Sequence, residues 1–228
     1  MAGNSLNLEI IVARPSGGPL VQGYMDGDPN AQTFFSGHFA DPAAYEAKVA
    51  EVDGRFDGAG RARAAEAIGV PPGGDATRLE RFVEEGGYVV TTGQQPGLFG
   101  GPLYSIYKGL TAARLAQALE ARLGKPVLPV FWIASEDHDW AEANHTHIVG
   151  LDNELHTPQV PAPDPEVHPS LHRIPLGHEI IDLREGFLQH LPESDFSAPY
   201  FELLRGAAVE GATLPGSFRQ ILEALLGP

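Results

Sequence analysis

The middle of the chain contains a strand, loop, helix and strand in succession, and this order constrains the fold most. Tyr88–Thr92 has the β-branched and aromatic composition of a strand. The glycine-rich segment Gly93–Gly101 follows, and Pro102 suits the first turn of a long helix. The almost continuous apolar run Val127–Ala134 is typical of a parallel strand that is covered on both faces. We therefore expect an α/β protein built on a βαβ unit with a right-handed crossover.

Three residues refine this unit. Gly124 suits the left-handed position after the last helical turn, and Pro126 prevents the helix from continuing. Pro129 lacks an N–H donor, which places it near the start of the strand pairing or in an edge strand.

Helices are also predicted on the N-terminal side of this unit. Asp41 is a good N-cap for a helix that begins at Pro42. Two further helices are expected at about residues 58–68 and 75–85, each ended by glycine or proline. Residues 1–40 are rich in turn signals, so we expect a loop with short pieces of structure there.

The C-terminal side is predicted to hold short strands followed by helices. Strands are expected at Thr146–Leu151 and near His156. Five prolines between Pro158 and Pro169 predict an extended loop. Helical spacing of apolar residues then predicts helices around Tyr200–Ala208 and Phe218–Leu226.

Composition excludes several classes of protein. With 15 basic and 30 acidic residues the net charge is −15, which opposes non-specific binding to nucleic acid or to an anionic membrane. The absence of cysteine excludes disulfides, iron–sulfur clusters, thiolate zinc sites and a cysteine nucleophile. The longest apolar run has eight residues, too few to span a bilayer, and Met1–Val12 does not resemble a signal peptide. We therefore expect a cytoplasmic protein with no membrane partner.

The glycine-rich loop is the first candidate site. A loop between a strand and a helix N-terminus offers N–H groups and partial positive charge to a phosphate or carboxylate. Gln94 and Gln95 add amide groups, and Lys108 lies about two turns into the helix. The spacing matches neither the dinucleotide fingerprint nor the Walker A motif. The alternative interpretation is a structural turn at a tight strand–helix joint.

A cluster of charged residues directly after the second strand is the second candidate. Glu136, Asp137, His138 and Asp139 place three carboxylates beside one imidazole. Because the carboxyl ends of parallel strands meet at one edge of a sheet, this cluster should face the same crevice as the glycine-rich loop. Such a group suits general acid–base chemistry or cation binding. The alternative is a solvated acidic turn that caps a helix near Trp140.

Histidines suggest a competing function. Asp137, His138, His145 and His147 could form the site of a metal-dependent hydrolase, although no established metal-ligand spacing is present and we predict no metal. The other histidines form no pattern and are expected to be surface or loop residues: His156, His168, His172, His178 and His190.

These motifs resemble a known family. The segments that carry the likeness are Thr92–Phe99, Gly101–Tyr104 with Tyr107-Lys108, Pro129–Ala134 and Glu136–Asp139, supported by Pro19–Lys48. Together they are similar to the bacillithiol biosynthesis cysteine-adding enzymes, the BshC family. The likeness is strong over residues 19–150 and weaker after that.

The resemblance implies a Rossmann-like parallel sheet core with flanking helices. It also implies a carbon–nitrogen ligase that adds L-cysteine to glucosaminyl-malate in the last step of bacillithiol biosynthesis, with ATP or ADP as the candidate cofactor. Catalytic roles then fall to Asp137, His138 and Asp139. Binding of nucleotide or substrate falls to Thr92, Gly93, Gln94, Gln95, Pro96, Gly97, Tyr104, Lys108 and Glu136.

Members of that family are considerably longer than this chain and continue into a helical coiled-coil region linked to homodimer formation. The resemblance therefore implies that residues 1–228 form the N-terminal part of an incomplete core. We expect an exposed apolar surface, including the face of the last helix around Phe218, Ile221 and Leu222, and a need for a complement or for self-association. A non-catalytic nucleotide- or partner-binding module is a further alternative.

Overall fold

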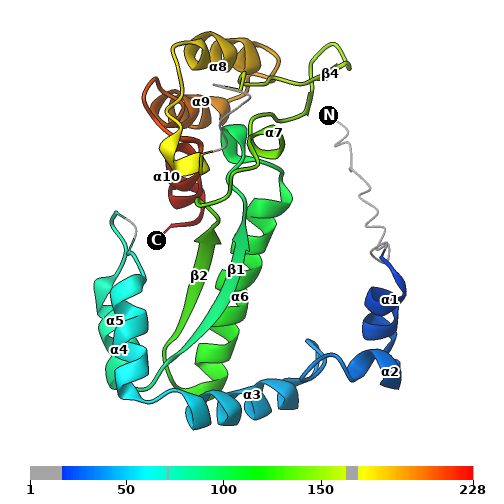
Figure 1. Cartoon of the computed structure of the whole chain (residues 1–228), viewed down its shortest axis with the longest axis vertical. Helices are drawn as coiled ribbons and strands as arrows, with labels where there is room; N and C mark the ends of the chain where they lie inside the picture. The colour runs from blue at the N-terminus through cyan, green and yellow to red at the C-terminus, as the bar shows by residue number, and fades with distance from the viewer. Residues whose placement is uncertain (1–16, 71, 163–168, 228) are drawn as a thin grey trace, which may run out of the picture. The chain divides into compact units, whose positions relative to one another are not determined.

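The computed structural model describes residues 17–70, 72–162 and 169–227 (Figure 1). The chain divides into two compact units, Met1–Asp57 and Gly58–Pro228, and each is described by itself. In the described part of the chain, no helix has the length and apolar character needed to cross a membrane.

The first unit is helical, with α1 (Pro19–Asp26), α2 (Pro29–Gln32) and α3 (Pro42–Arg55). The prediction for α3 is confirmed, because Asp41 caps it by accepting a hydrogen bond of 2.9 Å from the N–H of Ala43. The short pieces of structure expected before residue 40 are the helices α1 and α2, and residues 1–16 lie outside the description. The turn signals at 26–29 are in fact a helix stop followed by a cap: Gly27 adopts a left-handed φ of 73° after α1, and Asp28 caps α2.

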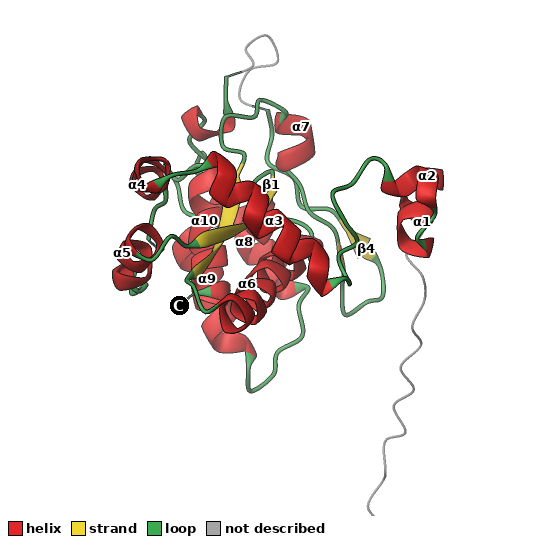
Figure 2. Cartoon of the chain, turned by 90° about the horizontal axis from the view of Figure 1, so that it is seen from below, coloured by secondary structure: helices red, strands yellow, loops and turns green. Residues whose placement is uncertain are grey.

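The second unit begins with the predicted helix pair and the βαβ arrangement. Its elements are α4 (Gly58–Ala67), α5 (Ala76–Glu84), β1 (Tyr88–Gln94), the 3-10 turn η1 (Leu98–Gly100), α6 (Tyr104–Leu123) and β2 (Val127–Ile133). Strands β1 and β2 pair in parallel, from Tyr88 with Val127 to Gln94 with Ile133. Helix α6 packs on both strands, and in Figure 2 these strands (yellow) lie among helices that include α6. The α/β fold with a parallel sheet and flanking helices is therefore confirmed.

One detail of this unit differs from the prediction, and two others agree with it. Helix α6 begins at Tyr104 instead of Pro102, and it ends as expected at Gly124, whose φ is 64°. Pro129 is paired with Val90, and in the described residues β2 has β1 as its one neighbour. The missing N–H of Pro129 is therefore tolerated in an edge strand, as predicted.

The rest of the unit holds α7 (Trp140–Ala143), β3 (Ile148–Val149), β4 (Leu155–His156), the 3-10 turn η2 (Leu171–Arg173), α8 (Glu179–Gln189), α9 (Ser197–Ala207) and α10 (Leu214–Leu226). The two predicted short strands pair antiparallel, with Ile148 opposite His156. Helix α8 was not predicted. Part of the expected proline-rich loop, residues 163–168, lies outside the described residues.

A buried cluster joins the glycine-rich loop to the C-terminal helices. Its members come from η1, α7, η2, α8 and α10 and from the segments between them: Leu98, Ala143, Val160, Leu171, Ile174, Leu176, Ile180, Ala208 and Leu214. Leu98 is 1% exposed, so the loop that carries it is anchored in the core. The glycine-rich loop of the candidate site is therefore supported by core residues that lie far from it in the sequence.

The buried Arg184 helps to connect α8 to α9. The Arg184 guanidinium donates hydrogen bonds to the carbonyl oxygens of Arg205 (3.0 Å) and Ala208 (2.9 Å), and it pairs with the carboxylate of Glu185. Arginine carries five N–H donors in a planar group, so one side chain can satisfy several acceptors at the end of a helix.

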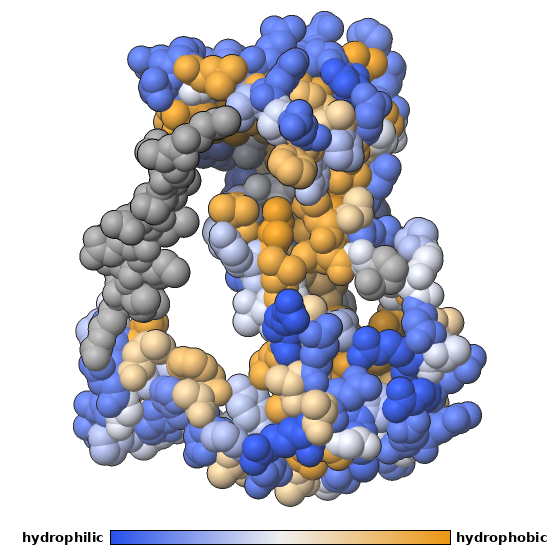
Figure 3. Space-filling model, turned by 180° about the vertical axis from the view of Figure 1, so that it is seen from behind, coloured by the Kyte–Doolittle hydropathy of each residue, from blue (hydrophilic) through white to orange (hydrophobic). Residues whose placement is uncertain are grey.

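The apolar face of α10 was expected to be exposed, and this expectation is wrong. Phe218, Ile221 and Leu222 are buried, because α10 packs against α6, α9, η1 and η2. Large apolar side chains are instead exposed on the sheet and on α6: Val89, Trp132, Leu103, Tyr104, Tyr107 and Leu110. Figure 3 shows hydrophobic residues (orange) gathered on one face of the molecule.

Replacing Phe218 by alanine tests this view of the core. Phe218 is 0% exposed, so Phe218→Ala should lower the free energy of unfolding by about 3–5 kcal/mol. Phe196→Ala is the matched control, because Phe196 is 77% exposed and its loss should change that free energy by about 0.5 kcal/mol or less. Urea unfolding of the 228-residue chain followed by circular dichroism measures both. Equal effects of the two substitutions would contradict the buried position of α10.

Candidate active site

The site lies where β1 and β2 end. Gln94, the last residue of β1, pairs with Ile133, the last residue of β2, and the carbonyl oxygen of Gln94 accepts a hydrogen bond of 3.1 Å from the N–H of Ala134. One residue further on, the Gln95 amide donates a hydrogen bond to the carboxylate of Asp137. The structure therefore brings together the two loops that the sequence singled out, at the same edge of the sheet.

Asp137 is the centre of this contact. One oxygen of its carboxylate accepts the hydrogen bond from Gln95, and the other accepts from the backbone N–H groups of His138 (2.7 Å) and Asp139 (3.0 Å). These bonds lower the pKa of Asp137, the Gln95 amide most and the Asp139 N–H next. Because hydrogen bonds to a carboxylate favour its charged form, Asp137 is a fixed anion and a weak base near neutral pH.

The other residues of the charged cluster have separate surroundings. Asp139 accepts a hydrogen bond of 3.0 Å from the N–H of Glu142 and so caps α7, which agrees with the structural alternative for this one residue. Glu136 and His138 are exposed at the end of the strand, where a ligand can reach them. The cluster thus contains one anchored carboxylate, one cap and two accessible side chains.

A segment distant in sequence supports the charged loop, and sequence reasoning did not find it. The backbone N–H of Leu171 donates to the carbonyl oxygen of Asp137 (2.7 Å), and that of His172 donates to the carbonyl oxygen of Ser135 (3.1 Å). The His172 ring nitrogen Nδ1 lies 3.1 Å from the same Ser135 oxygen. No sequence motif links residue 172 to residue 135, so the fold alone reveals the contact.

Helix α6 completes the other side of the site. Lys108 Nζ reaches back to the glycine-rich loop and donates to the carbonyl oxygen of Gly93 (3.2 Å) and to Oε1 of Gln94 (2.7 Å). Gln94 Nε2 in turn donates to the Tyr104 hydroxyl at 3.1 Å, and Lys108 Nζ lies 5.2 Å from the centre of the Tyr104 ring. One exposed positive charge therefore lies next to the backbone of the loop.

The loop itself has little room for side chains. Phe99, Gly100 and Gly101 all have a positive φ, of 53°, 96° and 65°. A Cβ at Gly97 would lie 2.6 Å from the Cα of Gly101, closer than such atoms come in real proteins. Gly97 therefore shapes the loop, and a Gly97→Val substitution would deform the backbone before it could report on ligand binding.

The remaining candidates are also partly structural. Pro96 is buried with Gly97, while Thr92 and Gly93 are half-buried in β1. The hydroxyl of Ser105, in the first turn of α6, is fully buried and has no hydrogen-bond partner among the described residues. Leaving a buried hydroxyl unpaired costs about 1–3 kcal/mol.

The structure does not assemble the competing metal group. His145 Nδ1 lies 3.0 Å from the Ala141 carbonyl oxygen, and His147 Nδ1 lies 2.9 Å from the Thr157 hydroxyl. The two rings meet edge to face at 5.1 Å, without Asp137 or His138.

Across residues 17–70, 72–162 and 169–227, one set of three or more potential metal ligands has donor atoms within 4.8 Å of one another, namely Asp152, His156 and His190. The expectation that His156 and His190 belong to no pattern is therefore wrong.

Comparison with known proteins gives a consistent result. Residues 6–228 match the family described as the bacillithiol biosynthesis BshC N-terminal Rossmann-like domain. The chain is 40% identical over 154 residues to the "Putative cysteine ligase BshC" of Heliobacterium modesticaldum, covering 67% of this chain and 28% of that protein. It is 37% identical over 177 residues to the protein of the same name from Solibacter usitatus, covering 71% of this chain and 33% of that protein.

The chain thus matches about a third of the length of these curated relatives. The family match includes the β1–α6–β2 unit and both loops at the end of its sheet. The chain therefore belongs to the BshC family and carries its N-terminal Rossmann-like domain.

Proposed function

We propose that this domain contributes the nucleotide and substrate site of a carbon–nitrogen ligase that joins L-cysteine to glucosaminyl-malate, the last step of bacillithiol biosynthesis. The observation that carries the proposal is the hydrogen bond between Gln95 and Asp137, which unites the glycine-rich loop and the charged loop. The names of the relatives, cysteine ligases, support the class of reaction.

The residues at the glycine-rich loop fit a nucleotide such as ATP or ADP. Lys108 provides a positive charge beside the loop, and the buried Ser105 hydroxyl is an unused polar group in the first turn of α6. The N-terminal end of this 20-residue helix carries partial positive charge, which favours a phosphate. A bound nucleoside triphosphate would supply the activation that a cysteine carboxylate needs before it can form an amide.

The charged loop would bind the amine of glucosaminyl-malate and accept its proton. Formation of an amide requires an unprotonated amine, so a nearby base must accept its proton. His138 is an exposed imidazole, the type of side chain most often used as a general base, whereas hydrogen bonds lower the pKa of Asp137 and make it a weak base. We therefore assign proton transfer to His138, electrostatic attraction of the ammonium form to Glu136 and Asp139, and the positioning of the loop to Asp137.

Assembly is the other part of the proposal. The exposed apolar side chains on the sheet and on α6 favour a covering partner, either a complementary part of the ligase or a second copy. In the full-length family we expect a homodimer.

Substitution of His138 tests the catalytic assignment. In the complete ligase that carries this domain, His138→Asn should lower turnover in a cysteine-adding assay by about 10²-fold or more, because the general base is lost. His178→Asn is the control, since His178 is an exposed histidine that pairs with Glu210 away from this loop, and turnover should not change. Normal turnover in His138→Asn with a lower melting temperature would show that the residue is structural.

Removal of the Gln95–Asp137 hydrogen bond should change the pKa of Asp137. Gln95→Ala removes the largest cause of the lowered pKa, so the pKa of the Asp137 carboxyl should rise toward its ordinary value, about 3.9. Carboxyl NMR titration of the 228-residue chain measures this change. Gln94→Ala is the control, because Gln94 contacts Lys108 and Tyr104 and should leave the titration of Asp137 unchanged.

The lowered pKa of Asp137 also makes the free energy of unfolding depend on pH. A carboxyl whose pKa is lowered by folding stabilises the native state fully above its unfolded pKa, about 3.9, and this stabilisation is lost as pH falls through the folded pKa. The difference in unfolding free energy between the wild type and Gln95→Ala should therefore be present at neutral pH and should shrink in acid. A difference that stays constant from neutral pH to pH 2 would contradict the charged hydrogen bond.

The exposed apolar surface predicts association. The isolated chain should sediment partly as a dimer or larger species, and Trp132→Ser should shift it toward monomer, because Trp132 is 64% exposed on β2. Phe196→Ser, at a 77% exposed position next to α9, should have less effect. Analytical ultracentrifugation over a range of concentrations decides this, and a wild-type chain that is monomeric throughout would overturn the prediction.

A further inference from the structure

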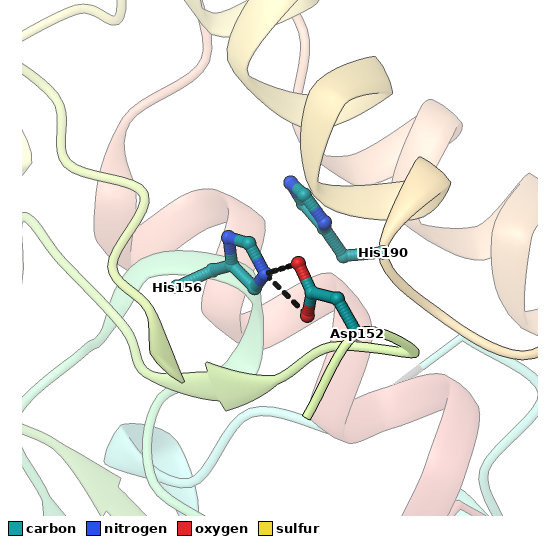
Figure 4. Close-up of side chains that lie close together, drawn as sticks. All are labelled: Asp152, His156 and His190. Carbon is teal, nitrogen blue, oxygen red and sulfur yellow. Dashed lines mark hydrogen bonds and ion pairs between the residues drawn. The ribbon is translucent and has the colours of Figure 1, made fainter. Parts of the chain in front are cut away.

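We propose that Asp152, His156 and His190 form a binding site for a divalent transition-metal cation such as Zn²⁺. Asp152 lies in the turn between β3 and β4, His156 ends β4, and His190 is the residue directly after α8. Potential ligand atoms of all three lie within 4.8 Å of one another, and Figure 4 shows the side chains converging. None of the three belongs to the candidate active site.

The β3–β4 turn is built around the first two of these side chains. Asn153 adopts a left-handed φ of 62°, and the N–H of Gly150 donates to the carbonyl oxygen of Glu154 at 2.9 Å, which closes the turn. The Asp152 carboxylate accepts a hydrogen bond of 3.0 Å from the N–H of Glu154. His156 Nε2 lies 2.9 Å from both oxygens of the same carboxylate. The carboxylate is thus held in place beside the imidazole.

A glycine keeps this space open. A Cβ at Gly150 would lie 2.7 Å from two atoms of the His156 ring and 2.7 Å from Oδ1 of Asp152. A larger residue at position 150 would therefore displace the imidazole and the carboxylate that it contacts.

The third ligand comes from a different element. The His190 ring stacks on the His156 ring, with 3.6 Å between the ring centres and 22° between their planes. A divalent cation between the two rings and the Asp152 carboxylate would take one nitrogen from each ring and one oxygen from the carboxylate.

The donor set suits this class of metal. Two imidazole nitrogens and one carboxylate oxygen are ligands that Zn²⁺ and related divalent ions take, with a position left for water. The chain has no cysteine, so a metal site in it must use nitrogen and oxygen donors. The net charge of −15 raises the local concentration of cations, and the half-buried position of both histidines leaves an approach from solvent.

Binding requires a small and definable rearrangement. Bond lengths of about 2.0–2.2 Å to a tetrahedral ion place neighbouring ligand atoms about 3.4 Å apart. His156 Nε2 and the Asp152 oxygens, now 2.9 Å apart, would therefore separate by about 0.5 Å, and the rings would rotate so that their lone pairs converge. Ligation through Nε2 requires the His156 ring to carry its proton on Nδ1, so the contact between Nε2 and the Asp152 carboxylate is replaced by a bond from each of them to the metal. The bound ion would tie the β3–β4 turn to the end of α8.

The test uses the metal alone. The 228-residue chain is stripped with a chelator, and Zn²⁺ is added in a calorimetric titration. We expect one Zn²⁺ per chain and a melting temperature that rises with the concentration of free zinc. Co²⁺ should give the visible absorption of tetrahedral nitrogen and oxygen coordination.

Variants show whether these residues are the ligands. Asp152→Asn, His156→Gln and His190→Gln should each weaken Zn²⁺ binding by at least about tenfold. His190→Gln is the safest for folding, since His190 lies at a helix end, and circular dichroism of each metal-free variant checks its fold. The double variant His145→Gln/His147→Gln removes the other pair of neighbouring histidines and should leave Zn²⁺ affinity unchanged. No binding by the wild type, equal affinity in His190→Gln, or loss of binding in the double variant instead would overturn the proposal.

Discussion

The parallel pairing of β1 with β2 is the constraint on which the candidate site depends. With Gln94 opposite Ile133, both strands end at the same level, so the loops that follow begin side by side. The pairing is close at Gly93, where a Cβ would lie 2.8 Å from the carbonyl oxygen of Trp132. A side chain at this position would push the strands apart and separate Gln95 from Asp137. One glycine in a strand therefore has as much influence on the site as the glycines in the loop.

The two loops are held from several directions, which keeps them in place without a ligand. Leu98 anchors the glycine-rich loop in the core, and Lys108 holds the start of that loop from α6. The charged loop is fixed by the helix cap at Asp139 and by the backbone of η2, which donates to the carbonyl oxygen of Asp137. Rigid loops lose little conformational freedom when they bind, so more of the contact energy appears as affinity. His138 and Glu136 are the exposed side chains on this well-supported backbone.

Local signals in the sequence predicted the parts of the fold that depend on neighbours along the chain. The strands β1 and β2, helix α6 and the caps at Asp41 and Gly124 follow from composition, turn residues and spacing within a few residues. The meeting of the two loops also followed, because the geometry of parallel strands requires it. Helix α8 escaped prediction, since the buried side chains Ile180, Phe187 and Leu188 face a core built from distant segments.

Contacts between distant residues were beyond sequence reasoning for the same reason. His156 and His190 look unrelated along the chain, and only the packing of α8 near the β3–β4 turn brings their rings together. The burial of Phe218 likewise depends on elements that precede it by many residues. In the loop, Gly97 suggested access for a ligand, whereas its actual constraint is the backbone of Gly101. A glycine in a sequence indicates a close contact, but it does not identify the atom that makes this contact.

Arg184 joins α8 to α9 through contacts of two kinds. Two of its acceptors are backbone carbonyl oxygens, which do not titrate, and a third is the carboxylate of Glu185. The bond between Gln95 and Asp137 and the pairing of His156 with Asp152 each lower the pKa of a carboxyl, so each weakens when acid protonates that carboxylate. Between α8 and α9, acid would likewise weaken the pairs that Glu185 forms with Arg205 and Arg184, whose hydrogen bonds lower the pKa of Glu185. The two hydrogen bonds from Arg184 to backbone oxygens would remain, so this joint retains part of its polar contact at a pH at which the other two contacts weaken.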